Sequence, residues 1–142
     1  IKSGIEPNPT ADQEEHTFTY ALYPHAEGWR QANTVQEAMK LNQPLLSEEG
    51  GHAGCQNSFV WVDKSNVIIE TVKMAEDDDG IIVRLYESEN AKTKAHIFFG
   101  EKISSVESCN CLEEIKQTIE TDGEGFEITV KPYEIQTYRV RF

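Results

Sequence analysis

The chain has 142 residues, of which 38% are hydrophobic and 27% are charged. This length and composition predict one globular domain rather than a disordered chain. The formal net charge of −12, from 25 acidic and 13 basic residues, argues against nucleic acids and anionic membrane surfaces as partners. No segment reaches the roughly 18 consecutive apolar residues of a transmembrane helix.

Residues 1–15 are expected to form a linker or surface loop, because Pro7 and Pro9 among polar neighbours forbid a helix interior and a central strand. Residues 16–142 are then expected to form a β domain. The chain begins without an initiator methionine or a hydrophobic leader, which favours a piece of a longer polypeptide. The odd number of cysteines and the lack of a usable Asn-x-Ser/Thr site favour a cytoplasmic location.

Residues 16–23 alternate between large apolar and smaller side chains. Phe18, Tyr20 and Leu22 fall on one side, and the residues between them fall on the other. Side chains of a β-strand point alternately to its two faces. The pattern therefore predicts a strand that begins directly after the N-terminal linker.

One short helix is predicted for residues 34–41. Thr34 and Glu37 have the spacing of a capping box, in which the two side chains satisfy free backbone amides at the start of a helix. Pro44 cannot continue a helix, because it lacks a backbone N–H and its ring clashes with the preceding turn. The helix is therefore expected to end before this proline.

The rest of the chain is dominated by short β-type runs. The segment 112–120 is ambiguous between helix and strand, and Asp79-Gly80 has the composition of a hairpin turn. Short strands at intervals of about 8–12 residues are typical of an all-β, antiparallel β-sandwich, here with one short helix. The predicted strands cover residues 59–62, 67–72, 81–86, 95–99, 103–106, 126–130 and 135–142.

Two of these strands are apolar on both faces. Residues 67–69 and 81–83 are runs of valine and isoleucine without alternation. One partner sheet covers only one face of such a strand, so the other face needs a second cover. Either the chain supplies that cover itself or the cover is missing, and the second alternative supports a piece of a larger protein.

Ordered sequence blocks resemble the late C-terminal region of the zinc-dependent α-mannosidases of glycoside hydrolase family 38. The likeness covers nearly the whole chain and is weakest over residues 88–126. The blocks that carry it are HTFTYALYPH from His16, TVQEA from Thr34, NQPLL from Asn42, SFVWVD from Ser58, VIIETVK from Val67, GIIVRLYE from Gly80 and KPYEIQTY from Lys131.

The resemblance implies a retaining glycoside hydrolase of the bacterial or cytosolic type that removes α-linked mannose from glycans. It places the zinc ion and the nucleophilic aspartate in an N-terminal catalytic part, so no catalytic residue, metal ligand or cofactor is expected in this chain. The expected partners are the remainder of the mannosidase chain and, through it, a mannose-containing glycan. Asp12, Glu15 and His16 are expected near the mouth of the sugar-binding cleft.

Three other readings compete with this one. His52 and Cys55 together with Cys109 and Cys111 suggest a metal site, although their spacing matches no known zinc motif. Asp77-Asp78-Asp79 before Gly80 lacks the acidic residue that begins an EF-hand loop, so we interpret it as a turn. An autonomous carbohydrate-binding module would use exposed aromatic rings such as Trp29, whereas Trp61 is expected in the core.

Overall fold

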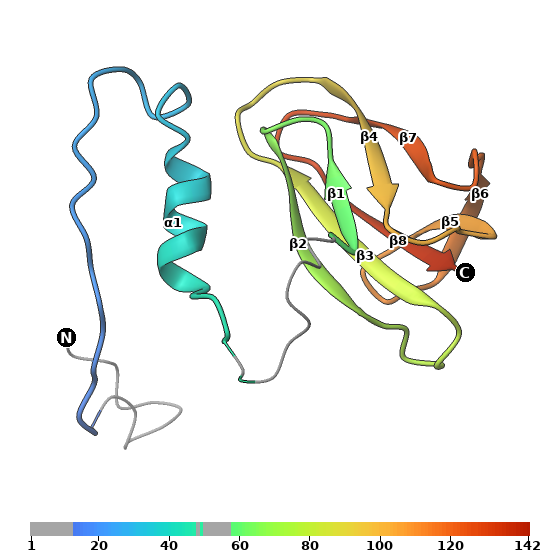
Figure 1. Ribbon diagram of the computed structural model, residues 1–142, viewed down its shortest axis with the longest axis horizontal. Helices are drawn as coiled ribbons and strands as arrows, with labels where there is room; N and C mark the ends of the chain where they lie inside the picture. Colours follow the sequence, from blue (N-terminus) through green and yellow to red (C-terminus); the bar gives the residue numbers. More distant parts are fainter. Residues whose placement is uncertain (1–12, 48, 50–57) are drawn as a thin grey trace. The chain divides into compact units, whose positions relative to one another are not determined.

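The computed structural model describes residues 13–47, 49 and 58–142. They form two antiparallel sheets with the strand orders β1-β4-β7 and β2-β3-β8-β5-β6 (Figure 1). The prediction of an all-β antiparallel sandwich with one short helix is confirmed. The elements are α1 (Thr34–Asn42), β1 (Val60–Val62), β2 (Val67–Met74), β3 (Ile81–Glu87), β4 (Thr93–Phe99), β5 (Ser105–Cys109), β6 (Ile115–Ile119), β7 (Gly125–Val130) and β8 (Ile135–Arg141).

Two compact units divide the chain, Ile1–Ala38 and Met39–Phe142, and their boundary lies inside α1. All eight strands belong to the second unit. No helix in the described part of the chain is long and apolar enough to cross a membrane.

Helix α1 begins where the sequence predicts it, but its N-terminal cap is different. The carbonyl of Asn33 accepts the Glu37 N–H at 3.0 Å, and Asn33 has a φ of 51°. Asn33 is therefore the N-cap, and Thr34 is already the first helical residue. The buried Thr34 hydroxyl has no hydrogen-bond partner among the described residues, so the predicted capping box through Thr34 is wrong. The helix ends two residues before Pro44.

The strand predicted for residues 16–23 is absent from the described structure. This segment has no ladder partner in either sheet. Phe18, Tyr20 and Leu22 are 77%, 81% and 91% exposed. A strand requires a neighbouring strand for its backbone hydrogen bonds, and no described segment supplies one here.

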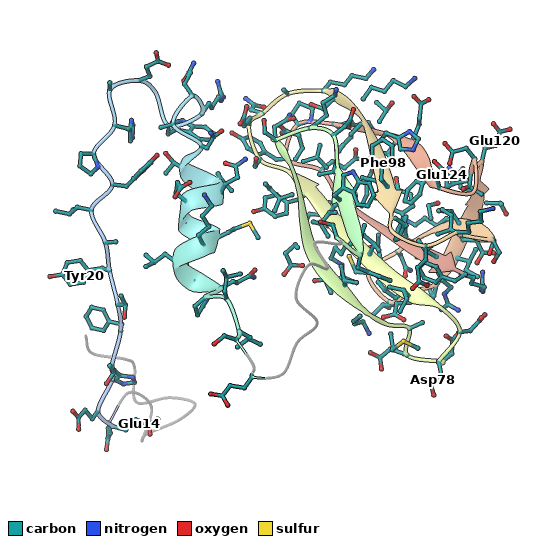
Figure 2. The ribbon with its side chains drawn as sticks, viewed as in Figure 1. Glu14, Tyr20, Asp78, Phe98, Glu120 and Glu124 are labelled. Carbon is teal, nitrogen blue, oxygen red and sulfur yellow. The ribbon has the colours of Figure 1, made fainter. Side chains whose placement is uncertain are left out.

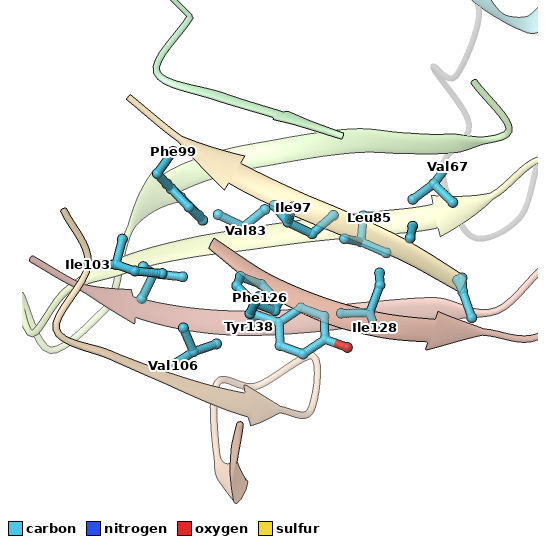
Figure 3. Packing of buried hydrophobic residues seen from close by; sticks show 13 residues of the cluster. Val67, Val83, Leu85, Ile97, Phe99, Ile103, Val106, Phe126, Ile128 and Tyr138 are labelled. Carbon is cyan, nitrogen blue, oxygen red and sulfur yellow. The ribbon is translucent and has the colours of Figure 1, made fainter. Parts of the chain in front are cut away.

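The core lies between the two sheets, where alternate side chains from both layers meet (Figure 3). The ring of Phe126 on β7 lies 4.9 Å from that of Tyr138 on β8, which joins the two layers at their centre. Phe99 packs on the other side of Phe126 with a centroid separation of 6.2 Å. Burial raises the pKa of Tyr138 to about 12, so its phenol is neutral at physiological pH.

The outer face of β3 is covered by the chain's own polar side chains. Ile82 is fully buried, although its register partners Lys73 and Arg139 lie on the face opposite the core. Arg139 donates to Asp77 at 2.7 Å, and Lys73 pairs with Glu113 at the same distance, so two loops are tied across this face. The apolar sequence of β3 therefore does not by itself require a neighbouring domain.

Candidate functional site

The candidate site is a cavity of about 550 Å³ beside the edge strands of the two sheets. Strand β6 ends the five-stranded sheet and β7 ends the three-stranded sheet. We call this space the β6–β7 cavity. Its lining includes His96, Glu120, Asp122, Gly125 and Glu127.

A tight turn between β6 and β7 holds Asp122 in the cavity wall. Oδ1 of Asp122 accepts the backbone N–H groups of Glu124 at 2.9 Å and Gly125 at 2.7 Å. These two bonds lower the pKa of the Asp122 carboxyl below its ordinary value, so it is ionised at neutral pH. Gly123 has a φ of 89° at the centre of this turn, a conformation that residues with a Cβ rarely adopt. The remaining oxygen, Oδ2, lies 3.8 Å from Nε2 of His96.

Gly125 allows the His96 ring to lie across β7. A Cβ at this position would come within 2.6 Å of His96 Nε2 and 2.2 Å of the Ile97 carbonyl oxygen. Only glycine avoids both contacts. The position of the imidazole between Phe98 and the cavity thus depends on a residue that carries no side chain.

An aromatic column runs from the cavity across the outer face of the three-stranded sheet. The rings of His96 and Phe98 are stacked at 4.2 Å, and those of Phe98 and Trp61 are stacked at 5.5 Å. Figure 2 marks Phe98, Glu120 and Glu124 at this part of the sandwich. Val60 and Val62 pack against the core, so Trp61 points outward and is 42% exposed. The expectation that Trp61 belongs to the core is wrong.

Of the residues expected near a sugar-binding cleft, Asp12 lies outside the described residues. Glu15 and His16 are exposed and belong to the first unit, whereas the cavity belongs to the second. The nearness of these three residues to a catalytic cleft stays a prediction. Sequence reasoning did not identify the β6–β7 cavity, because it falls where the family resemblance is weakest.

The suggested metal site lies only partly within the described residues. His52 and Cys55 lie outside the described residues, so the four-residue set stays a prediction. Cys109 is buried, which raises the pKa of its thiol, and Cys111 is exposed. Within residues 13–47, 49 and 58–142, no group of three or more histidine, cysteine, aspartate or glutamate side chains is placed to hold a metal ion.

The two antiparallel sheets define the chain's main body as a β-sandwich domain. Residues 66–138 match the C-terminal beta sandwich domain of the glycosyl hydrolases of family 38, and the chain belongs to this family. It is 29% identical to alpha-mannosidase G of Dictyostelium discoideum, over 98% of this chain and 14% of that protein. It is 32% identical to alpha-mannosidase 2C1 of Homo sapiens, over 80% of this chain and 11% of that protein.

A third relative, alpha-mannosidase 2C1 of Mus musculus, is 28% identical over 96% of this chain and 14% of its own length. The chain thus spans only 11–14% of the length of these three relatives. The weak stretch at residues 88–126 lies inside the span that the family model matches, so that model extends the resemblance through it.

Proposed function

We propose that this chain is the non-catalytic C-terminal β domain of a zinc-dependent, retaining α-mannosidase that hydrolyses α-linked mannose from glycans in the cytoplasm. The domain packs against the catalytic part of the same polypeptide and stabilises it. The zinc ion and the nucleophile belong to the preceding part of that polypeptide. The observation that carries this proposal is the family match over residues 66–138, together with alpha-mannosidase relatives that align over nearly the whole chain.

The decisive test uses the longer polypeptide encoded by the source gene. We expect the sequence upstream of Ile1 to encode the zinc and nucleophile residues, and the longer polypeptide to release mannose from α-linked mannosides. The 142-residue chain alone is expected to be inactive in the same assay. Inactivity of the longer, zinc-loaded polypeptide, or mannosidase activity of the 142-residue chain by itself, would contradict the proposal.

A second candidate function is carbohydrate binding at the β6–β7 cavity. Glu120, Asp122 and Glu127 provide carboxylate oxygens that accept hydrogen bonds from sugar hydroxyls. The aromatic column beside them offers a flat apolar surface at Trp61 for the C–H face of a pyranose. The carboxylates and the net charge of −12 favour an uncharged ligand over an anionic one. A neutral oligosaccharide meets these conditions.

Trp29 is the weaker of the two candidate tryptophans for this role. The guanidinium carbon of Arg30 lies 5.0 Å from the centre of the Trp29 ring, so a cation already occupies one face of that indole. Trp29 is therefore the tryptophan to replace, so that the fluorescence of Trp61 alone reports binding.

Titration with an α-linked mannose oligosaccharide tests the second candidate. In a Trp29→Phe background, Trp61 is the one remaining tryptophan, and we expect a saturable change in its fluorescence. Asp122→Asn keeps an oxygen for the turn but removes a charged acceptor, and should weaken binding roughly tenfold. A linear, unsaturable response, or equal affinity of Asp122→Asn and the background protein, would rule out binding at this cavity.

A further inference from the structure

The segment 17–22 runs as an extended trace (Figure 1) and has the side-chain pattern of a strand, but it has no strand partner among the described residues. It is extended, and within the described chain no backbone hydrogen bond joins it to another segment. The rings of Phe18 and Tyr20 lie 6.5 Å apart, as expected for neighbours on one face of an extended chain. Figure 2 shows the Tyr20 side chain projecting from one side of this segment. The hydroxyl of Tyr23 donates to the Ala32 carbonyl at 3.0 Å and anchors the end of the segment.

The exposure of three large apolar side chains to water is energetically unfavourable for this segment. Phe18, Tyr20 and Leu22 leave most of their apolar surface in solvent, and burying such a side chain stabilises a structure by about 1.5–3 kcal/mol. The residues between them, Thr17, Thr19 and Ala21, are small or polar and suit a face that remains in solvent. An extended chain with one apolar face and free backbone groups is the type of segment that adds to the edge of a β-sheet.

The comparisons show that relatives of this chain extend far beyond the region that matches it. The family model for the sandwich begins at residue 66, so residues 17–22 lie outside it. The alignment with alpha-mannosidase G nevertheless covers 98% of this chain, which therefore includes most of the first 65 residues. This chain corresponds to only 14% of that relative's length, so most of such a polypeptide lies outside the present chain.

We propose that residues 17–22 add as a strand to the edge of a β-sheet in the remainder of the longer polypeptide, with Phe18, Tyr20 and Leu22 buried against that sheet's core. This inference rests on the proposed function only in requiring a longer polypeptide. It identifies the contact through which the C-terminal domain is joined to the part that precedes it. Residues 17–22 would then be part of a sheet in the remainder of the longer polypeptide, although helix α1 and the sandwich follow them directly in the chain.

Backbone hydrogen exchange tests the inference directly. In the longer polypeptide, alternate amides within residues 17–22 are expected to exchange at least roughly a hundredfold more slowly than in the 142-residue chain, because paired amides exchange only after local opening. Uniformly fast exchange of these amides in the longer polypeptide would overturn the inference. Slow exchange in the 142-residue chain, accompanied by dimers in light scattering, would assign the partner to a second copy and overturn it as well.

A matched pair of variants separates strand addition from unspecific apolar contact. In the longer polypeptide, Tyr20→Asp places a charge on the buried face and should accelerate exchange of these amides at least roughly tenfold. Thr19→Asp places the same charge on the opposite face and should change exchange by less than about threefold. Equal effects of the two variants would contradict a strand with one buried face.

Failure of this inference is distinguishable from failure of the proposed function. Mannosidase activity of the longer polypeptide is assayed separately from amide exchange. If the longer polypeptide is an active enzyme and the amides of residues 17–22 exchange rapidly, only the proposed strand contact is contradicted. If these amides are protected but the longer polypeptide is inactive, the proposed function is contradicted and the strand contact is supported.

Discussion

Replacing Phe126 by alanine is expected to lower the free energy of unfolding of the 142-residue chain by about 3–5 kcal/mol. Phe126 is 1% exposed and contacts aromatic rings from both sheets, including Phe99 and Tyr138. Its removal leaves a cavity between two layers that are fixed by their strand ladders and cannot close around it. Urea denaturation followed by circular dichroism measures the change.

The control for this prediction is the same substitution at an exposed phenylalanine. Phe18→Ala should change the free energy of unfolding by less than about 0.5 kcal/mol, because Phe18 is 77% exposed in the first unit. If the Phe126→Ala protein unfolds at the same urea concentration as the Phe18→Ala protein, Phe126 does not pack between the two sheets as described.

Replacing Glu87 by glutamine is expected to lower the free energy of unfolding of the 142-residue chain by about 3 kcal/mol at neutral pH. The Glu87 carboxylate is fully buried and accepts hydrogen bonds from the Asn66 side chain at 2.9 Å and from the backbone N–H groups of Glu89 at 2.7 Å and Tyr133 at 3.1 Å. Glutamine keeps the size but turns one acceptor into a donor, which faces another donor. Glu89→Gln is the control, because it leaves the backbone N–H that donates to Glu87 in place, and it should change the free energy of unfolding by less than about 0.5 kcal/mol.

The effect of Glu87→Gln should depend on pH in a defined direction. Burial raises the pKa of Glu87, but the hydrogen bonds from Tyr133, Asn66 and Glu89 outweigh it, so the folded-state pKa lies below the ordinary value of 4.5. A lowered pKa contributes stability that is fully present above about pH 4.5 and is lost as the pH falls through the folded-state value. The difference between the parent chain and Glu87→Gln should therefore shrink under acid conditions. A difference that grows as the pH falls below 4.5 would contradict this assignment.

Strand prediction was successful where alternation and burial coincide. The strands β2, β3, β4, β7 and β8 lie within three residues of their predicted bounds, because their inward side chains are apolar and their ends carry turn residues. The sequence is ambiguous at strand β6, because four of its five residues are exposed and an exposed edge strand has little hydrophobic pattern.

Strand β5 was expected at residues 103–106 but covers Ser105–Cys109. Ile103 is buried, yet its N–H donates to the Gly123 carbonyl in a loop rather than to a strand ladder. The run from 16 to 23 alternates between large apolar and smaller side chains but forms no strand in this structure. Alternation describes the side chains alone, whereas a strand also needs a hydrogen-bonded neighbour. Local pattern does not specify which segments pair.

The candidate site depends on contacts between residues that are distant in the sequence. His96 meets Asp122 and Gly125 because β4 pairs with β7 in a register that places Phe98 opposite Gly125. No sequence motif spans these three positions, so the sequence could not predict that they lie together. The outward orientation of Trp61 likewise follows from the two flanking valines packing on the core.

By itself, the sequence determined the all-β class, the position of the single helix and the likeness to family 38 mannosidases, because these follow from local periodicity and ordered residue blocks. Only the tertiary structure decided that Ile82 is covered by the chain's own loops and that His96, Asp122 and Gly125 meet at one cavity. The physical reason is that strand register between distant segments selects which side chains become neighbours, and register is settled by the packing of the whole sandwich.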